Sequence, residues 1–133
     1  MREIYNIEED NFKIMESMEE INDFIDIYFS IVGDYQFINA LNEFNNRTGF
    51  GIEDFLILFY QDFDEWEKYR CKENEVALLM YYPEPDQDRI AYLDFQQFYP
   101  YLYQYGQKFI RKHPEKKEEV IRLLKEIKES WGV

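Results

Sequence analysis

The stretch from Ser17 to Gly33 constrains the fold most, because it combines a helix start, one apolar face and a helix stop. Ser17 and Glu20 have the spacing of a capping box, in which each side chain accepts a hydrogen bond from the other residue's backbone N–H. Gly33 is the residue type that most often ends a helix. Between them, apolar residues recur at the spacing of one buried helical face. These residues are Ile21, Phe24, Ile25, Tyr28, Phe29 and Val32.

The following segment predicts a second helix and then an ambiguous run. Asp34 is a suitable N-cap. The inward face of this helix would consist of Phe37, Ile38, Leu41 and Phe44. The apolar run Phe55–Tyr60 fits either a buried strand or a helical turn, because periodicity does not distinguish them over so few residues. Glu53 and Asp54 favour a short helix within residues 52–63, since acidic residues stabilise a helix N-terminus.

Residues 66–93 predict a small antiparallel sheet. The expected strands are Trp66–Cys71, Glu75–Tyr82 and Arg89–Leu93. Residues 72–74 would form the first turn. Residues 83–88 would form the second, because the two prolines there cannot donate hydrogen bonds to a strand ladder. Strands this close in sequence are most simply connected as an antiparallel meander.

Two more helices are predicted after the sheet. Asp94 and Gln97 form a second capping pair at the start of a long helix. Pro100 predicts an irregular first turn there, because proline removes one helical hydrogen bond. Pro114 suits the first position of the last helix, where its missing N–H costs little. The expected core residues are Phe98, Leu102, Tyr105 and Phe109 in the first helix, and Val120, Ile121, Leu124, Ile127 and Trp131 in the second.

Together these elements predict one α+β domain over residues 1–133. Helices at both ends of the chain would pack on a small antiparallel β-sheet of about three strands, residues 66–93. Residues 1–16 carry weaker patterns, and we expect them to form a lead-in, either ordered or loosely packed. A domain of this length buries roughly two-thirds of its unfolded surface, which is enough for a core without disulfides.

The sequence offers no catalytic set and no cofactor or metal motif. His113 is the only histidine and Cys71 the only cysteine, so a histidine-activated nucleophile or a cysteine cluster is not expected. Glu65 and Glu67 could act as the acid and base of a hydrolase. Such pairs are bound to occur among 28 acidic residues, so this alternative is the weaker one. We therefore predict no enzymatic activity, no cofactor and no bound metal.

The sequence also predicts the cellular location of the protein. The acidic first ten residues are unlike a signal or transit peptide. The longest apolar runs have the length of a strand, well short of the roughly 20 residues that a membrane-spanning helix needs. A single cysteine fits a reducing compartment. We expect a soluble, cytoplasmic protein.

Charge predicts the kind of partner. Residues 1–105 hold 23 Asp and Glu against 7 Lys and Arg, a net charge of −16, whereas residues 106–133 hold 5 against 8, a net charge of +3. The basic residues of the last helix alternate with acidic ones, as on an ordinary solvated helix face. An acidic surface repels nucleic acids and membranes and attracts basic proteins. We therefore expect a basic protein partner, with the oligomeric state left open.

The predicted contact residues are carboxylates grouped around aromatic side chains. They are Asp62, Asp64, Glu65, Trp66, Glu67, Tyr82, Glu84, Asp86 and Asp88. Carboxylates would pair with Lys and Arg of the partner, while Trp66 and Tyr82 would serve as anchors. An adaptor or scaffold module that binds a basic protein segment is the alternative, and it would accept many basic sequences instead of one partner.

The order of several short motifs resembles a known family. The motifs are Gly49-Phe50-Gly51-x-x-Asp54; Asp64-Glu65-Trp66-Glu67 with Tyr69; Asp94-x-x-x-Phe98-Tyr99-x-x-Leu102; Lys112-His113-Pro114-Glu115; and Leu123-Leu124-x-x-Ile127-Lys128. From about Ser17 to Trp131, the chain resembles the immunity proteins of contact-dependent growth inhibition systems, and among them the CdiI group that neutralises ribonuclease toxins. The resemblance implies a cytoplasmic protein that binds one cognate toxin domain and blocks its active site. The RNA-binding cleft of such a toxin is basic.

Overall fold

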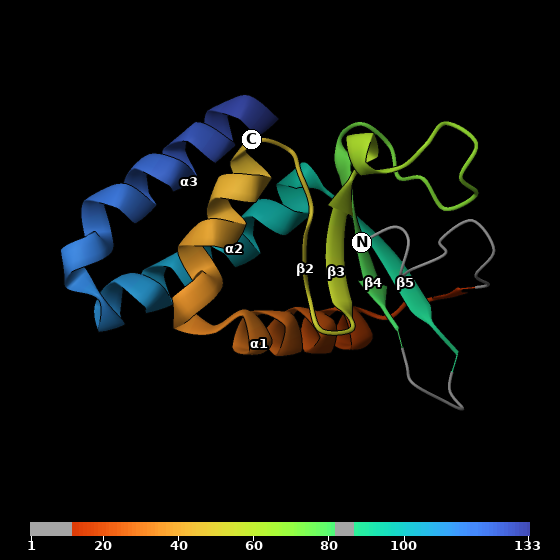
Figure 1. The fold of residues 1–133 in the computed structure, drawn as a ribbon, viewed down its shortest axis with the longest axis horizontal. Helices are drawn as coiled ribbons and strands as arrows, with labels where there is room; N and C mark the ends of the chain where they lie inside the picture. Colours follow the sequence, from red (N-terminus) through yellow and green to blue (C-terminus); the bar gives the residue numbers. More distant parts are fainter. Residues whose placement is uncertain (1–11, 82–86) are drawn as a thin grey trace.

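The computed structural model describes residues 12–81 and 87–133, which form an α+β fold around a mixed sheet (Figure 1). Within these residues the sheet has five strands, in the order β1-β5-β4-β3-β2, instead of about three. Helices lie on both sides of the sheet segment in the chain, so the predicted fold class is confirmed. The elements are β1 (Lys13–Ile14), α1 (Met18–Asn45), β2 (Phe50–Ile52), β3 (Phe55–Phe59), η1 (Tyr60–Asp62), β4 (Glu75–Met80), β5 (Arg89–Asp94), α2 (Phe95–Lys112), η2 (Pro114–Lys116) and α3 (Lys117–Trp131).

Helix α1 begins at its predicted cap and bends at Gly33. The Ser17 hydroxyl accepts a hydrogen bond from the backbone N–H of Glu20, with a distance of 3.1 Å between Oγ and N. All six residues of the predicted apolar stripe before the bend are buried. Gly33 has φ +63° and ψ −179°, a combination adopted almost only by glycine. The two predicted helices are thus one bent element, whose second half turns toward α2 and α3 (Figure 1).

The centre of the sheet is antiparallel. Strand β4 pairs with β5 from Glu75 opposite Asp94 to Met80 opposite Arg89, and with β3 on its other side. The strands predicted near residues 75–82 and 89–93 are therefore confirmed within the described residues. Most of the turn predicted at 83–88 lies outside them. Residues 12–16 of the expected lead-in are ordered, because β1 pairs in parallel with β5, and Phe12 and Met15 are buried.

The helix predicted within residues 52–63 is wrong. This segment contributes the end of β2 and all of β3, followed by the single 3-10 turn of η1. Strand β3 lies between β2 and β4, and both neighbours supply hydrogen-bond partners to its backbone. A short apolar run adopts the conformation that its neighbours can pair with, and those neighbours are not visible in the run itself.

The strand predicted at Trp66–Cys71 is also wrong. Its backbone instead makes two successive turns. The N–H of Glu67 bonds to the carbonyl oxygen of Asp64 at 3.1 Å, and the N–H of Arg70 bonds to that of Glu67 at 3.2 Å. These local bonds occupy groups that a sheet ladder would need, so the segment crosses the sheet face as a loop.

The two C-terminal helices are confirmed as α2 and α3, with three corrections. Pro114 begins the 3-10 turn η2, and α3 itself starts at Lys117. The Asp94–Gln97 capping box is complete. Helix α2 is regular from its first residue, so the irregular turn predicted at Pro100 is wrong. Pro100 lies on the exposed side, where water can satisfy the carbonyl group that loses its partner. In α3, Ile121 was predicted to be buried, but it is 45% exposed. Leu123 lies in the core instead, on the same helical face as Val120 and Ile127.

The sheet separates two cores. On one face, α1, α2 and α3 cover β3, β4 and β5, and Trp131 stacks on Phe95 and Phe98 with ring centroids 4.5 and 6.1 Å apart. On the other face, the loop of residues 60–74 is the cover, with Phe63, Tyr69 and Cys71 buried against the strands. The contacts between these buried side chains and the sheet hold the loop in place.

We predict that Gly33→Ala lowers the free energy of unfolding by about 1–3 kcal/mol, the usual strain of a residue in this backbone region. A Cβ at this position would meet no atom within 4 Å, so backbone strain is the only expected cost. Urea unfolding followed by circular dichroism measures the change. Ser30→Ala, on the exposed side of the same helix, is the control and should stay within about 0.5 kcal/mol. Equal stability of both variants would contradict the strain argument.

Candidate partner-binding site

Residues Asp62–Glu67, here called the acidic turn, begin where η1 ends and form part of the loop that covers the sheet. The carboxylate of Asp62 is directed at its own chain. Its Oδ2 accepts hydrogen bonds from the backbone N–H groups of Gly49, at 2.9 Å, and Phe59, at 2.7 Å. A Cβ at Gly49 would lie 2.6 Å from the carbonyl oxygen of Ile57 and 3.0 Å from Asp62 Oδ2. Asp62 thus joins β2 to the end of β3 at a place that only glycine fits.

Glu67 closes the acidic turn from its other end. The side chain is 4% exposed, and its Oε1 accepts the backbone N–H of Asp64 at 2.8 Å. A buried carboxylate that bonds to a backbone N–H three residues earlier holds the turn in one shape. Asp62 and Glu67 therefore act within the fold, and their predicted contact with a partner remains a prediction.

The remaining residues of the acidic turn are presented outward. Trp66 is 69% exposed, Glu65 is exposed and Asp64 is half-buried. Tryptophan is highly buried on average, and when it lies at a protein surface it is one of the strongest interface anchors. The arrangement is a turn held by hydrogen bonds, with one large aromatic ring and one exposed acidic residue at its tip.

Of the other predicted contact residues, the structure describes only Asp88, which lies away from this tip. Asp88 is half-buried and precedes β5, at the end of the sheet where Met80 pairs with Arg89. The acidic turn lies at the opposite end, where Phe59 pairs with Val76. Tyr82, Glu84 and Asp86 lie outside the described residues. Among the described members of the predicted set, the structure gathers those in residues 62–67 and places Asp88 apart from them.

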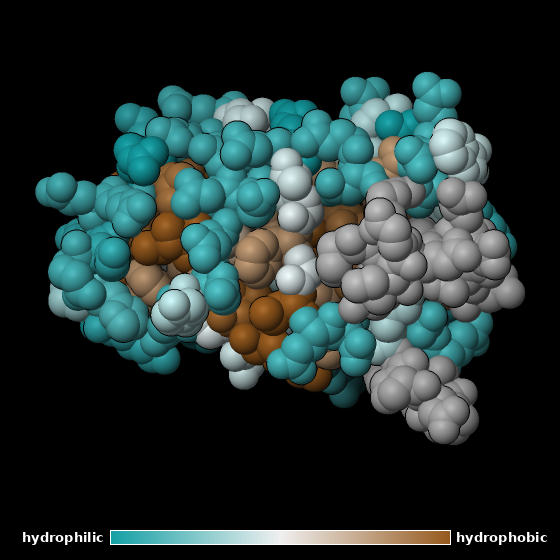
Figure 2. All heavy atoms as spheres, in the orientation of Figure 1, coloured by the Kyte–Doolittle hydropathy of each residue, from teal (hydrophilic) through white to brown (hydrophobic). Residues whose placement is uncertain are grey.

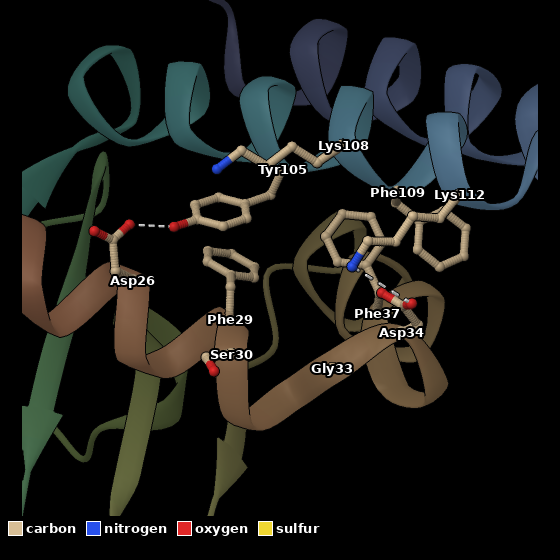
Figure 3. Close-up of a pocket in the computed structure, with 10 residues that line it drawn as sticks. All are labelled: Asp26, Phe29, Ser30, Gly33, Asp34, Phe37, Tyr105, Lys108, Phe109 and Lys112. Carbon is tan, nitrogen blue, oxygen red and sulfur yellow. Dashed lines mark hydrogen bonds and ion pairs between the residues drawn. The ribbon is translucent and has the colours of Figure 1, made fainter.

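A hollow of about 270 Å³ beside the bend of α1 bears on the hydrolase alternative (Figure 3). Asp26 and Asp34 lie at opposite ends of it, with the rings of Phe29 and Tyr105 between them. Asp26 accepts a hydrogen bond from the Tyr105 hydroxyl. Asp34 lies 4.0 Å from Lys112 Nζ and 3.1 Å from the Nε2 atom of His113. The two acids are paired separately and do not converge on a common point, as a catalytic pair must.

A second hollow, of about 580 Å³, lies on the other side of Asp34. Ile38 and Phe109 form its apolar lining, and Figure 2 shows apolar residues in this gap between the second half of α1 and α3. Lys116 and Glu119 lie at its rim. Its charges are mixed, so it has no clear complementarity to a basic partner.

The two residues considered as nucleophile or base have roles in packing. Cys71 is 3% exposed, and burial raises the pKa of its thiol to about 12, so that it stays protonated at neutral pH. His113 caps the end of α2 and packs on Phe109, with ring centroids 4.8 Å apart. Among residues 12–81 and 87–133, no group of three or more His, Cys, Asp or Glu side chains is placed to hold a metal ion. In the same residues, no helix has the length and apolar character needed to cross a membrane.

Comparison with known families identifies the chain. A family model described as CDI immunity protein, where CDI is contact-dependent growth inhibition, matches residues 21–124. The chain belongs to the CDI immunity protein family. Membership carries an immunity function, the neutralisation of a CDI toxin, and CDI immunity proteins are generally not catalysts. No curated protein matches the chain. The matched region extends from α1 into α3 and includes the acidic turn.

The sequence patterns of this CDI immunity protein missed two exposed apolar residues. Met18 and Ile27 are 53% and 44% exposed on α1. Both fall outside the buried stripe, and their off-stripe spacing was the signal that could have indicated an exposed apolar position.

We predict that Asp62→Ala lowers the free energy of unfolding by about 2 kcal/mol, because two backbone N–H groups lose a charged acceptor. Thermal or urea unfolding measures this loss. Glu65→Ala is the matched control, since Glu65 is exposed on the same turn, and it should change stability by no more than about 0.5 kcal/mol. If the two variants are equally stable, Asp62 does not hold β2 to β3 as described.

Proposed function

We propose that this protein binds the ribonuclease domain of a cognate CDI toxin and occludes its RNA-binding cleft, without catalysing a reaction. The supporting observation is the acidic turn, which presents Trp66 and Glu65 on a backbone fixed by Asp62 and Glu67. A rigid surface loses little conformational entropy on binding, so more of the contact energy contributes to affinity.

Charge supports a partner that binds RNA. A ribonuclease cleft carries Lys and Arg side chains that meet phosphate groups, and carboxylates can occupy the same positions through charge-assisted hydrogen bonds. The net charge of −13 attracts such a cleft over a distance of about 8 Å at physiological salt. Charge around the contact thus favours rapid encounter, while a buried Trp66 would slow dissociation.

The proposed site of action is the cytoplasm, because a toxin that cuts cellular RNA must be neutralised where the RNA is. Asp64, Asp88 and the predicted contact residues Tyr82, Glu84 and Asp86 would extend the contact beyond Trp66 if the toxin reaches across the sheet. An adaptor for basic segments would bind many basic proteins, so binding of a single toxin is the distinguishing property.

We predict that Glu65→Lys and Trp66→Ala each weaken binding of the catalytically inactivated cognate toxin domain by about 2 kcal/mol or more, roughly 30-fold in Kd. The toxin domain is taken from the open reading frame immediately upstream. Isothermal titration calorimetry or surface plasmon resonance measures the affinity, and circular dichroism verifies that each variant is folded.

Two variants serve as matched controls for this test. Glu118→Lys on α3 makes the same change in net charge as Glu65→Lys, and Tyr35→Ala removes an aromatic ring that is 90% exposed at the bend of α1. Both should bind within about twofold of the unmodified protein. Equal losses in Glu65→Lys and Glu118→Lys would assign the charge effect to a diffuse acidic field, and equal losses in Trp66→Ala and Tyr35→Ala would remove Trp66 as the anchor. Similar affinity for unrelated basic proteins would favour the adaptor.

A further inference from the structure

A third hollow, of about 210 Å³, lies on the opposite face of the sheet from the acidic turn. It is formed by the start of α1 and by the adjoining ends of β4 and β5, and we call it the α1 hollow. Its lining residues are Met15, Glu20, Asp23, Phe24, Ile27, Met80 and Arg89. Its volume would hold about seven water molecules at roughly 30 Å³ each, which is enough space for one long side chain.

The lining of the α1 hollow is largely apolar. Ile27 lines it and is 44% exposed, and the side chains of Met15, Phe24 and Met80, which are buried or half-buried, continue the apolar surface inward.

The lining of the α1 hollow carries two carboxylates and one cation, Arg89. Glu20 is paired with Arg89, with Oε2 and Nη1 2.9 Å apart. Asp23, in contrast, makes no hydrogen bond or ion pair with any residue that the structure describes. An apolar concavity therefore lies beside a carboxylate, Asp23, that has no partner among the described residues.

We propose that the α1 hollow is a second contact surface for the toxin and receives one of its Lys or Arg side chains. This inference rests on the proposed function. The aliphatic part of such a side chain would lie along Phe24 and Ile27, and its charged end would bond to Asp23. Charge complementarity favours the basic toxin over a second copy of this chain, because two copies would bring like charges together.

The position of the α1 hollow makes it separable from the acidic turn. The α1 hollow is at the Met80–Arg89 end of the strands, under α1, whereas the acidic turn covers the other face. In Figure 1, the start of α1 and the loop of residues 60–74 both lie away from α3. Substitutions in one surface leave the contacts of the other unchanged.

The test measures the affinity of the inactivated toxin domain for two variants of the α1 hollow. Asp23→Lys reverses the free carboxylate, and Ile27→Ser removes the exposed apolar wall with little change in helix propensity. Each should weaken binding at least tenfold. The controls are Glu118→Lys, which matches the change in charge, and Ile121→Ser on α3, which matches Ile27 with 45% against 44% exposure. The controls should bind within twofold of the unmodified protein.

Each other outcome has a defined meaning. Normal affinity of folded Asp23→Lys and Ile27→Ser, together with weakened Glu65→Lys and Trp66→Ala, overturns the α1 hollow and leaves the proposed function intact. If the unmodified protein does not bind the toxin, the proposed function fails and this inference fails with it. Analytical ultracentrifugation of the free protein tests whether a second copy of this chain occupies the α1 hollow. A dimer that Ile27→Ser dissociates would identify the second copy as the occupant and overturn the proposal.

Discussion

The central strands are apolar on both faces, and the rest of the structure follows from the need to cover them. Val76, Ala77, Leu78 and Leu79 of β4 are all fully buried, although consecutive strand residues point to opposite sides. Three helices cover one face, and the loop of residues 60–74 covers the other. The loop that carries Trp66 therefore contributes to the core. Its exposed tip is held in place because the rest of the loop packs on the sheet.

Carboxylates divide into two kinds on this framework, which explains how so acidic a chain folds and still offers a binding surface. Asp62 and Glu67 bond to backbone N–H groups and shape the acidic turn. Glu65 and Asp23 face solvent, where charge contributes to the encounter with a partner more than to stability. The exposed acids repel one another, and burial of the aromatic core, with stacks such as Trp131 on Phe95, opposes this destabilising effect.

Local patterns predicted the helices well, and long-range pairing limited the rest. The signals that start or bend a helix act within one helical turn, so the sequence alone predicts them. Examples are Ser17, Gly33 and the Asp94–Gln97 pair. The run Phe55–Phe59 became a strand because β2 and β4 flank it, and residues 66–71 became a loop because Asp64 and Glu67 bond locally. The sequence predicted Trp66 as an anchor. It did not predict that Asp62 and Glu67 point inward, because their hydrogen bonds depend on how Gly49 and the sheet are placed in three dimensions.

The most direct test of the account is a titration of the toxin's ribonuclease activity with the pure protein, at toxin concentrations well above Kd. Occlusion of the active site predicts a linear fall in RNA cleavage that reaches zero at one protein per toxin and returns in full when the complex is dissociated. Full cleavage by a toxin saturated with this protein would contradict occlusion. Loss of cleavage at far less than one protein per toxin would indicate catalytic inactivation and contradict the account equally.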